Sequence, residues 1–200
     1  MLWFEKISAE LDVLAAASQA QFPLVLKMTA ILWIIQIINA FLHYRLNVLG
    51  IMPRRFWGLI GIPFSPFLHS SFSHLTMNTP PFMILTLMVL MYGTVQFYYV
   101  TLLIVCMTGI LIWLVGRPAL HIGSSGLVMG YWGYTLMNAY SHFNLNSVIL
   151  AVVCLYYFGS FYMNVFPEKR EVSWEAHLFG LMSGIGVSYL LPVPAVMLGS

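Results

Sequence analysis

Charged residues are scarce in this sequence: Asp, Glu, Lys and Arg make up only 7% of its 200 residues, whereas a soluble domain carries about 25%. Hydrophobic residues account for 60%, and the mean hydropathy is +0.88. A chain with so few charges cannot cover itself with a polar surface, which excludes an ordinary soluble globule. The length allows one compact domain, and the composition predicts an integral membrane protein whose partner is the lipid bilayer.

Other scarcities narrow the function. The net charge is only +2, and the basic residues form no stripe, so nucleic acid is not an expected partner. Neither a phosphate-cradling motif nor a His-Glu-x-x-His motif is present. The two cysteines, Cys106 and Cys154, lie in apolar runs, which favours buried packing over a disulfide or a metal pair. We expect no metal and no cofactor.

Long uncharged stretches locate the membrane-crossing helices. No charged residue occurs in 56–116 or in 118–167, and each crossing needs about 20 apolar residues. Breaks in these stretches and their flanks predict six spans, at roughly 24–44, 72–91, 95–115, 124–140, 147–165 and 175–191. Residues 46–68 are apolar but interrupted by Gly and Pro, which predicts a loop half-sunk in the membrane interface. The expected fold is an all-α bundle of six transmembrane helices.

The first 22 residues differ in pattern from the spans. They contain acidic residues and lack a basic region ahead of an apolar core, so a signal peptide is not indicated. Apolar residues recur at helical spacing at Phe4, Ile7, Leu11 and Leu14, which predicts an amphipathic helix on the membrane surface; a partly disordered tail is the alternative. The expected organisation is an interfacial segment at 1–22, a core at 23–192 and a short tail at 193–200.

Polar side chains gather at the beginnings of three spans. The second, fourth and sixth spans start on the same side of the membrane, because successive spans alternate in direction. They begin with His69, His74 and Asn78, with Ser124 and Ser125, and with His177. Polar groups in a membrane are costly and usually face a shared interior or a water-filled cavity. The three sets therefore predict one site near one face of the membrane.

Small residues indicate which of these spans lie side by side. The fourth span contains Gly126-x-x-x-Gly130, and the sixth contains Gly180-x-x-x-Gly184. Such pairs allow the backbones of two membrane helices to approach closely. His177 lies on the glycine face of its helix, so this packing would bring it next to Ser125. The alternative is that the glycines pack against other helices.

Together these residues resemble the rhomboid family of intramembrane serine proteases, in its compact six-span prokaryotic form. Three motifs carry the resemblance, in order: His69-x4-His74-x3-Asn78, Gly123-x-Ser125-Gly126 and Ala176-His177-x2-Gly180-x3-Gly184. The resemblance implies that Ser125 is the nucleophile and His177 its base. It also implies that His74 and Asn78 stabilise the oxyanion, and the Ser125 backbone N–H completes the available set of donors.

Elementary chemistry agrees with this assignment. A neutral histidine can remove the proton from a serine hydroxyl near pH 7. No acidic residue lies in a span where it could orient His177, and Glu175 is two residues away, about 200° around a helix, so it points elsewhere. The prediction is therefore a Ser125–His177 dyad without a carboxylate, and Ser124 is a rival nucleophile.

Positions around the dyad fit the family less closely. His69 is either a helper at the site or a histidine that packs the loop, and Gly123 is a candidate support because a glycine leaves the neighbouring hydroxyl uncovered. The position one turn after the nucleophile is often Tyr in the family and is Met129 here. The order Arg54-Arg55-Phe56-Trp57 does not reproduce the family's Trp-Arg pair, and Pro80-Pro81 predicts a kink in the second span.

The resemblance also implies substrates and location. Substrates would be transmembrane segments with Gly, Pro or polar residues near the cut, because a helical peptide bond must unwind before attack. Bacterial members lie in the cell membrane with the site open to the outside, although most Lys and Arg here fall on the site side, which the positive-inside rule places in the cytoplasm. The oligomeric state stays open.

Two rival functions follow from the same residues. A rhomboid-like protein without activity would bind or escort membrane helices, and a metalloenzyme would use His69, His74 and His177 as ligands. The absence of a carboxylate at the depth of these histidines disfavours the metalloenzyme.

Overall fold

The structure is a computed structural model that describes residues 2–141, 152 and 173–192. Over these residues the regular structure is helical, with a single antiparallel bridge between Ile51 and His121 and no strand. The all-α prediction is therefore confirmed for the described part of the chain. The predicted fifth span, 147–165, lies outside the described residues apart from residue 152, and the predicted tail 193–200 lies wholly outside them.

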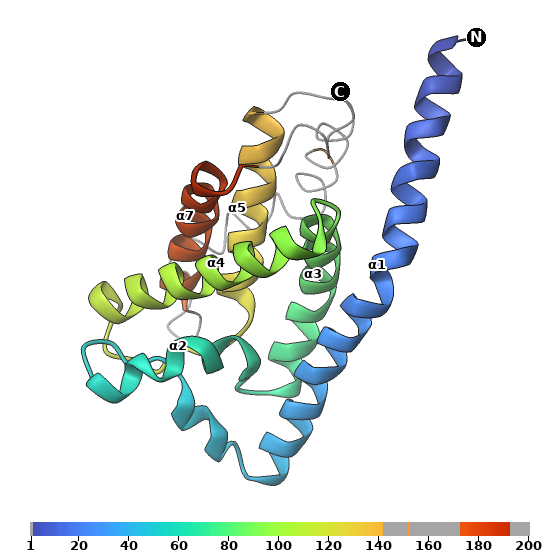
Figure 1. The fold of residues 1–200 in the computed structure, drawn as a ribbon. Helices are drawn as coiled ribbons and strands as arrows, with labels where there is room; N and C mark the ends of the chain where they lie inside the picture. Colours follow the sequence, from blue (N-terminus) through green and yellow to red (C-terminus); the bar gives the residue numbers. More distant parts are fainter. Residues whose placement is uncertain (1, 142–151, 153–172, 193–200) are drawn as a thin grey trace.

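Helix α1 covers both the predicted N-terminal segment and the predicted first span. It runs without interruption over Leu2–Phe41 and contains Pro23, so the two predicted parts lie on one helix (Figure 1). A proline inside a helix costs about 3 kcal/mol, but the preceding 15–20 segment is rich in alanine, the strongest helix former. The helix ends where His43 and Tyr44 take positive φ values of 52° and 61°.

A loop of short helical turns follows, as the interrupted apolar pattern predicted. It contains η1 Arg45–Leu49, η2 Phe56–Leu59, α2 Gly61–Phe64 and η3 Ser65–Phe67. The loop is fixed to the end of α4 (Thr94–Val115), because the Arg54 guanidinium donates to the carbonyl of Gly116 at 2.7 Å and the Trp113 indole donates to the carbonyl of Arg55 at 2.8 Å.

The next helices coincide closely with the ranges expected from the sequence. They are α3 Phe72–Leu90, α4 Thr94–Val115, α5 Ser125–Ser141 and α7 Trp174–Leu190. Helix α3 continues through Pro80-Pro81. Among the described residues, two stretches, Ala15–Phe41 and Thr94–Val115, are long and apolar enough to cross a membrane.

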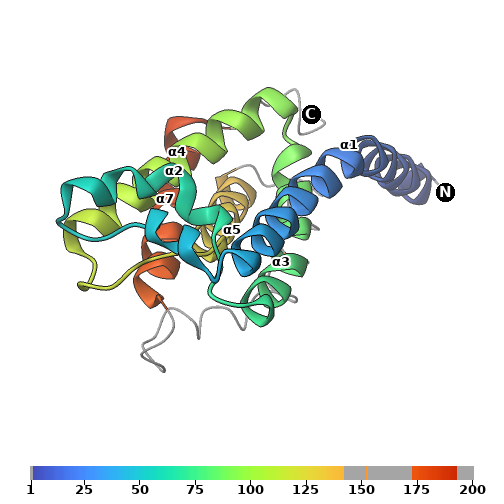
Figure 2. The same ribbon diagram turned by 90° about the horizontal axis from the view of Figure 1, so that it is seen from below.

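Helix α5 occupies the centre of the described bundle. It contacts α3, α4 and α7, and Figure 2 shows it between α7 and α3. Its Tyr131 and Tyr134 are completely buried, and the Tyr131 hydroxyl is 2.7 Å from that of Thr101 on α4. Helix α1 packs against α3 on the outside.

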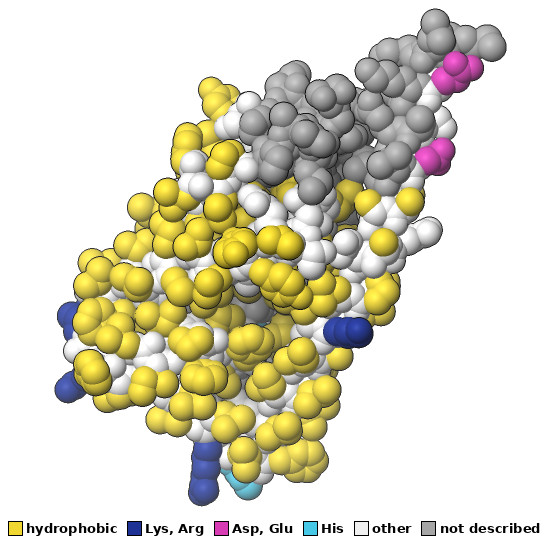
Figure 3. Space-filling view, viewed as in Figure 1, with side chains coloured by type: hydrophobic (Ala, Val, Ile, Leu, Met, Phe, Trp, Pro, Cys, Tyr) yellow, Lys and Arg dark blue, Asp and Glu magenta, His cyan; other side chains and the backbone are white. Residues whose placement is uncertain are grey.

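The surface of the molecule is unusually apolar. Side chains such as Ile34, Leu102 and Phe56 are 55%, 58% and 86% exposed, and Figure 3 shows hydrophobic side chains over most of one face with Lys and Arg at only a few points. Because such a surface is unfavourable in water, it indicates a membrane protein, together with the two long apolar helices.

Candidate active site

The predicted site residues lie at the beginnings of three helices. Ser71 caps α3, because its hydroxyl accepts from the backbone N–H of His74 at 3.0 Å. Ser173 caps α7 in the same way through Ala176, the residue before His177. Ser125 is the first residue of α5. Since a serine N-cap fixes the first turn of a helix, both histidines are held in well-defined turns.

Glycine contacts align α5 with α7. A Cβ atom added to Gly180 would collide with the carbonyl oxygen of Gly126, and one added to Gly184 would collide with that of Gly130. Later residues of one helix meet later residues of the other, so the two helices are parallel. A Cβ atom at Gly126 would lie 3.2 Å from the carbonyl oxygen of Ala176.

This alignment places the dyad candidates at one level of neighbouring helices. Gly126 directly follows Ser125, and Ala176 directly precedes His177. His177 is buried, whereas Ser125 is partly exposed. His177 also lies within electrostatic range of His74 on α3, so the structure brings residues from all three helices together.

Gly123 keeps a small space open between His74 and Ser125. Its φ of +119° belongs to the region that disfavours residues with a Cβ atom. A Cβ atom there would lie 3.1 Å from Nε2 of His74 and 3.8 Å from Oγ of Ser125. The imidazole nitrogen and the hydroxyl therefore border the same space, which the missing side chain leaves free.

His74 and Asn78 support each other on the first turns of α3. The Asn78 amide donates to the carbonyl of His74 at 3.1 Å, and Nδ1 of His74 lies 3.2 Å from the hydroxyl of Ser70. A hydrogen bond at Nδ1 fixes the ring orientation and leaves Nε2 directed at the space beside Gly123. An amide NH2 group has two hydrogens, so Asn78 retains a second one to donate.

Ser124 and His69 form a separate buried pair. The Ser124 side chain is completely buried, and its hydroxyl lies 3.3 Å from Nε2 of His69. The His69 ring packs edge-on against His74, with ring centroids 5.0 Å apart. Burial, together with the neighbouring His74, lowers the pKa of His69 to about 3. His69 is therefore a neutral imidazole that packs the loop beside the site, and Ser124 is less accessible than Ser125.

Met129 lies one turn along α5 and is only 1% exposed. It belongs to the main hydrophobic core together with Val128 and Tyr131. The Tyr134 hydroxyl is bonded to the carbonyl of Leu191 at 3.1 Å, so this aromatic residue is engaged at the far end of α7.

Sequence reasoning assigned no role to four polar residues beside the site. Arg117 forms an ion pair with Glu175 at 3.1 Å, and the imidazole of His121 lies 2.6 Å from the hydroxyl of Ser173. The only available signal was that Arg117 and Glu175 are isolated charges bordering long uncharged stretches. His121 lies in a loop, where no periodic pattern indicates which way a side chain points.

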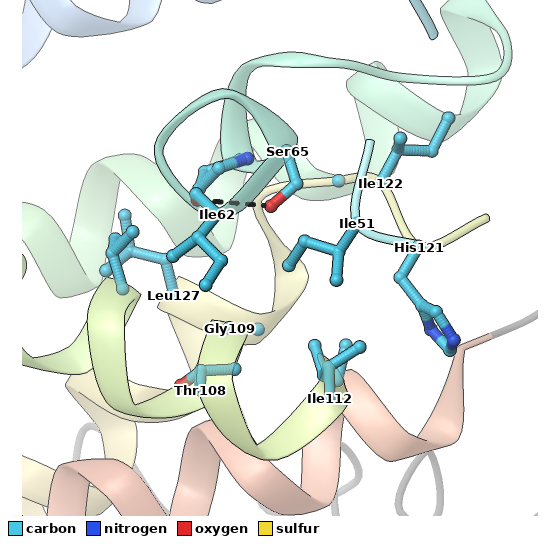
Figure 4. A pocket seen from close by; sticks show the side chains of 14 residues that line it. Ile51, Ile62, Ser65, Thr108, Gly109, Ile112, His121, Ile122 and Leu127 are labelled. Carbon is cyan, nitrogen blue, oxygen red and sulfur yellow. Dashed lines mark hydrogen bonds between the residues drawn. The ribbon is translucent and has the colours of Figure 1, made fainter. Parts of the chain in front are cut away.

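A separate cavity of about 30 Å³ is lined by Gly123 but by neither His74 nor Ser125. Figure 4 shows its wall of aliphatic side chains, including Ile51, Ile62 and Ile112. The hydroxyl of Thr108 also lines it and has no hydrogen-bond partner among the described residues. The volume fits about one water molecule, so this cavity is too small for a substrate side chain.

Potential metal ligands do not converge in the described part of the chain. No group of three or more His, Cys, Asp or Glu residues is placed to hold a metal ion there. Cys106 is a free thiol on α4, and Cys154 lies outside the described residues.

Comparisons with known proteins agree with the family resemblance that the sequence indicated. The family model described as "Rhomboid domain" matches residues 53–193. "Uncharacterized protein Rv1337" of Mycobacterium tuberculosis is 31% identical over 179 residues, which cover 85% of this chain and 75% of that protein. "Uncharacterized protein ML1171" of Mycobacterium leprae is 31% identical over 183 residues, which cover 85% of this chain and 71% of that protein.

Proposed function

Because the chain belongs to the rhomboid family, as its motifs predicted, we propose that it is an intramembrane serine endopeptidase that uses Ser125 and His177 as a catalytic dyad. The fold we propose has six transmembrane helices, the fifth of which, 147–165, follows α5 and precedes α7 in the sequence. Its substrates are transmembrane segments of other proteins.

The proposed reaction begins when His177 accepts the proton of Ser125 and Oγ attacks the carbonyl carbon of the peptide bond. The tetrahedral anion collapses as the C–N bond breaks, and the protonated His177 gives its proton to the leaving amine. A water molecule then attacks the acyl-enzyme with His177 again acting as base, which releases the acid and restores Ser125. The proposed dyad uses no carboxylate from Glu175, because that side chain is engaged with Arg117.

The space beside Gly123 is the observation that carries this proposal. It is bordered by Oγ of Ser125 and by Nε2 of His74, so a carbonyl group placed there would meet a nucleophile and a hydrogen-bond donor. The Ser125 N–H belongs to the first turn of α5, where backbone N–H groups lack intrahelical partners. With Asn78, these donors would stabilise the oxyanion, and each is worth about 3 kcal/mol of barrier in comparable sites.

The position of Ser125 in the membrane indicates which peptide bonds the enzyme would meet. A nucleophile at the beginning of a transmembrane helix meets peptide bonds just below the membrane surface, where substrate backbone is helical and hidden. We therefore expect cleavage near Gly, Pro or polar residues that let the helix unwind. The proposed setting is a bacterial cell membrane with the site open to the extracytoplasmic side.

Cleavage of a model single-span substrate by the protein in liposomes tests the proposal. Ser125→Ala and His177→Ala are expected to abolish cleavage and labelling by a fluorophosphonate probe, because they remove the nucleophile and its base. Ser124→Ala is the matched control and retains both, because Ser124 faces His69.

Two results would contradict the assignment. Activity that survives Ser125→Ala but disappears in Ser124→Ala would transfer the nucleophile to the neighbouring serine. A wild-type protein that binds the substrate segment without cleaving it or reacting with the probe would be a non-catalytic member of the family.

A further inference from the structure

Two polar links join the segments that lead into α5 and α7. The first is the ion pair of Arg117 and Glu175, in which the guanidinium Nε lies 3.1 Å from the carboxylate and the Arg117 backbone N–H donates to the same oxygen at 3.4 Å. The Glu175 side chain is only 3% exposed. Burying a carboxylate is expensive unless it is paired, so Glu175 ties the beginning of α7 to residue 117.

The second link is the contact between His121 and Ser173. Nε2 of His121 lies 3.1 Å from the carbonyl oxygen of Arg117, and Nδ1 lies 2.6 Å from the hydroxyl of Ser173. A carbonyl can only accept, so Nε2 carries the proton and Nδ1 accepts from Ser173. The Ser173 oxygen in turn accepts the backbone N–H of Ala176. Burial lowers the pKa of His121, which keeps the ring in the neutral form that this pattern requires.

The second link lies at equivalent distances along the chain from the two dyad residues. His121 precedes Ser125 by four residues, and Ser173 precedes His177 by four residues. The segment that carries His121 is also held from the opposite side, because its backbone exchanges hydrogen bonds of 3.0 and 2.9 Å with Ile51. The bond between His121 and Ser173 therefore joins a fixed loop to the cap of the helix that carries His177.

We propose that Arg117–Glu175 and His121–Ser173 form a clasp that positions His177 relative to Ser125. The inference rests on the proposed function. The glycine contacts set how closely α5 and α7 approach. Because glycine has no side chain that could interlock with the partner helix, these contacts alone do little to prevent one helix from sliding or rotating against the other. The clasp adds an ion pair and hydrogen bonds next to the dyad, so we assign its four members as positioning residues rather than as groups that touch the substrate.

Substitutions at Ser173 separate the clasp from the helix cap. Glycine is tolerated at a helix N-cap almost as well as serine, so Ser173→Gly removes the bond to His121, and with it the side-chain bond to Ala176, at little cost to the stability of α7. We expect kcat for the model substrate to fall about tenfold, the value of one net hydrogen bond, with KM unchanged. Ser173→Thr keeps the hydroxyl and is expected to keep kcat.

A double-mutant cycle tests whether His121 and Ser173 act through each other. His121→Phe and Ser173→Gly are each expected to lower kcat about tenfold, and the double variant is expected to be no worse than either. Additive losses, or a thermal unfolding midpoint that falls while kcat stays constant, would overturn the clasp as a positioning device.

The rate of fluorophosphonate labelling separates this proposal from the proposed function. A wild-type protein that labels and cleaves, combined with unaltered kinetics in Ser173→Gly, overturns the clasp alone. A wild-type protein that neither labels nor cleaves overturns the proposed activity, and the catalytic role of the clasp with it.

Discussion

Gly123→Ala is the most direct test of the space in which we place the oxyanion. The substitution adds one methyl group at a position where the backbone φ is +119°. That methyl group would lie 3.0 and 3.1 Å from Cε1 and Nε2 of His74, closer than ordinary van der Waals contact. It would also stand on the side that faces the Ser125 hydroxyl, at 3.8 Å.

The substitution has two separable costs. An alanine at positive φ destabilises the folded state by about 1–3 kcal/mol. Displacing the His74 ring removes one oxyanion donor, which costs about 100-fold or more in kcat in comparable sites. The loss of activity should therefore exceed what the loss of stability explains, because a protein that is still folded at the assay temperature loses little activity through its backbone strain.

Gly93→Ala is the matched control. Gly93 precedes α4 with a φ of +106°, so an alanine there has a similar backbone penalty. It lies at the end of α3 opposite to His74, away from the candidate site. The assay compares kcat for the single-span substrate, the rate of fluorophosphonate labelling and the thermal unfolding midpoint of both variants with those of the wild-type protein.

Equal losses of activity in the two variants would refute the placement of the oxyanion beside Gly123. The same conclusion follows if Gly123→Ala lowers the unfolding midpoint but leaves both rates at the wild-type level. A selective loss in Gly123→Ala, with similar midpoints, is the expected result.

Two further predictions concern helix packing and pH. Gly184→Ala should lower the free energy of unfolding by about 1–3 kcal/mol, because its methyl group would collide with the Gly130 carbonyl. Gly186→Ala should be neutral or slightly stabilising, because its methyl group would meet only the flexible end of Met107 at 3.4 Å. Equal unfolding midpoints in the two variants would contradict this prediction. Folding lowers the pKa of His69 from 6.5 to about 3, so between these pH values the folded state binds fewer protons than the unfolded state. The free energy of unfolding should therefore be highest above pH 6.5 and decrease as the pH falls towards 3. Unfolding midpoints measured across this range should depend less on pH in His69→Gln, and identical slopes would count against the buried neutral imidazole.

The sequence predicted the helices and the site through different signals. Uncharged stretches located α3 and α4 almost to the residue, because a break in hydropathy and a helix end coincide when the solvent is lipid. The convergence of His74, Ser125 and His177 was predictable from chain direction, since alternate helices begin on the same side.

Features that depend on local competition were not predictable. The helix continues through Pro23, and alanine-rich sequence on one side of that proline favours this continuity. The sequence favoured Ser125 over Ser124 only through the family resemblance and gave no physical reason for the choice. Ser124 precedes the first turn of α5, where its carbonyl accepts from Val128 at 3.0 Å, and this one-residue offset turns its hydroxyl towards His69.

The arrangement of helix ends explains how a chain with so few charges could stabilise an anion. The beginnings of α3 and α5 meet at His74 and Gly123, and those of α5 and α7 meet at Gly126 and Ala176. Each helix N-terminus carries a partial positive charge and unpaired N–H groups. A lysine or arginine at the same depth would have to lose its hydration, which is costly in a low-dielectric site.

Fixed backbone dipoles avoid that cost, because they are already oriented in the folded state. Arg117, a cation close to this region, is paired with Glu175 and so contributes little net charge. On this reasoning, the electric field at the proposed oxyanion position comes from the N-termini of α3, α5 and α7 and from the neutral side chains of His74 and Asn78. It should therefore depend on how accurately the ends are aligned, which is the property that the glycine contacts and the clasp would control.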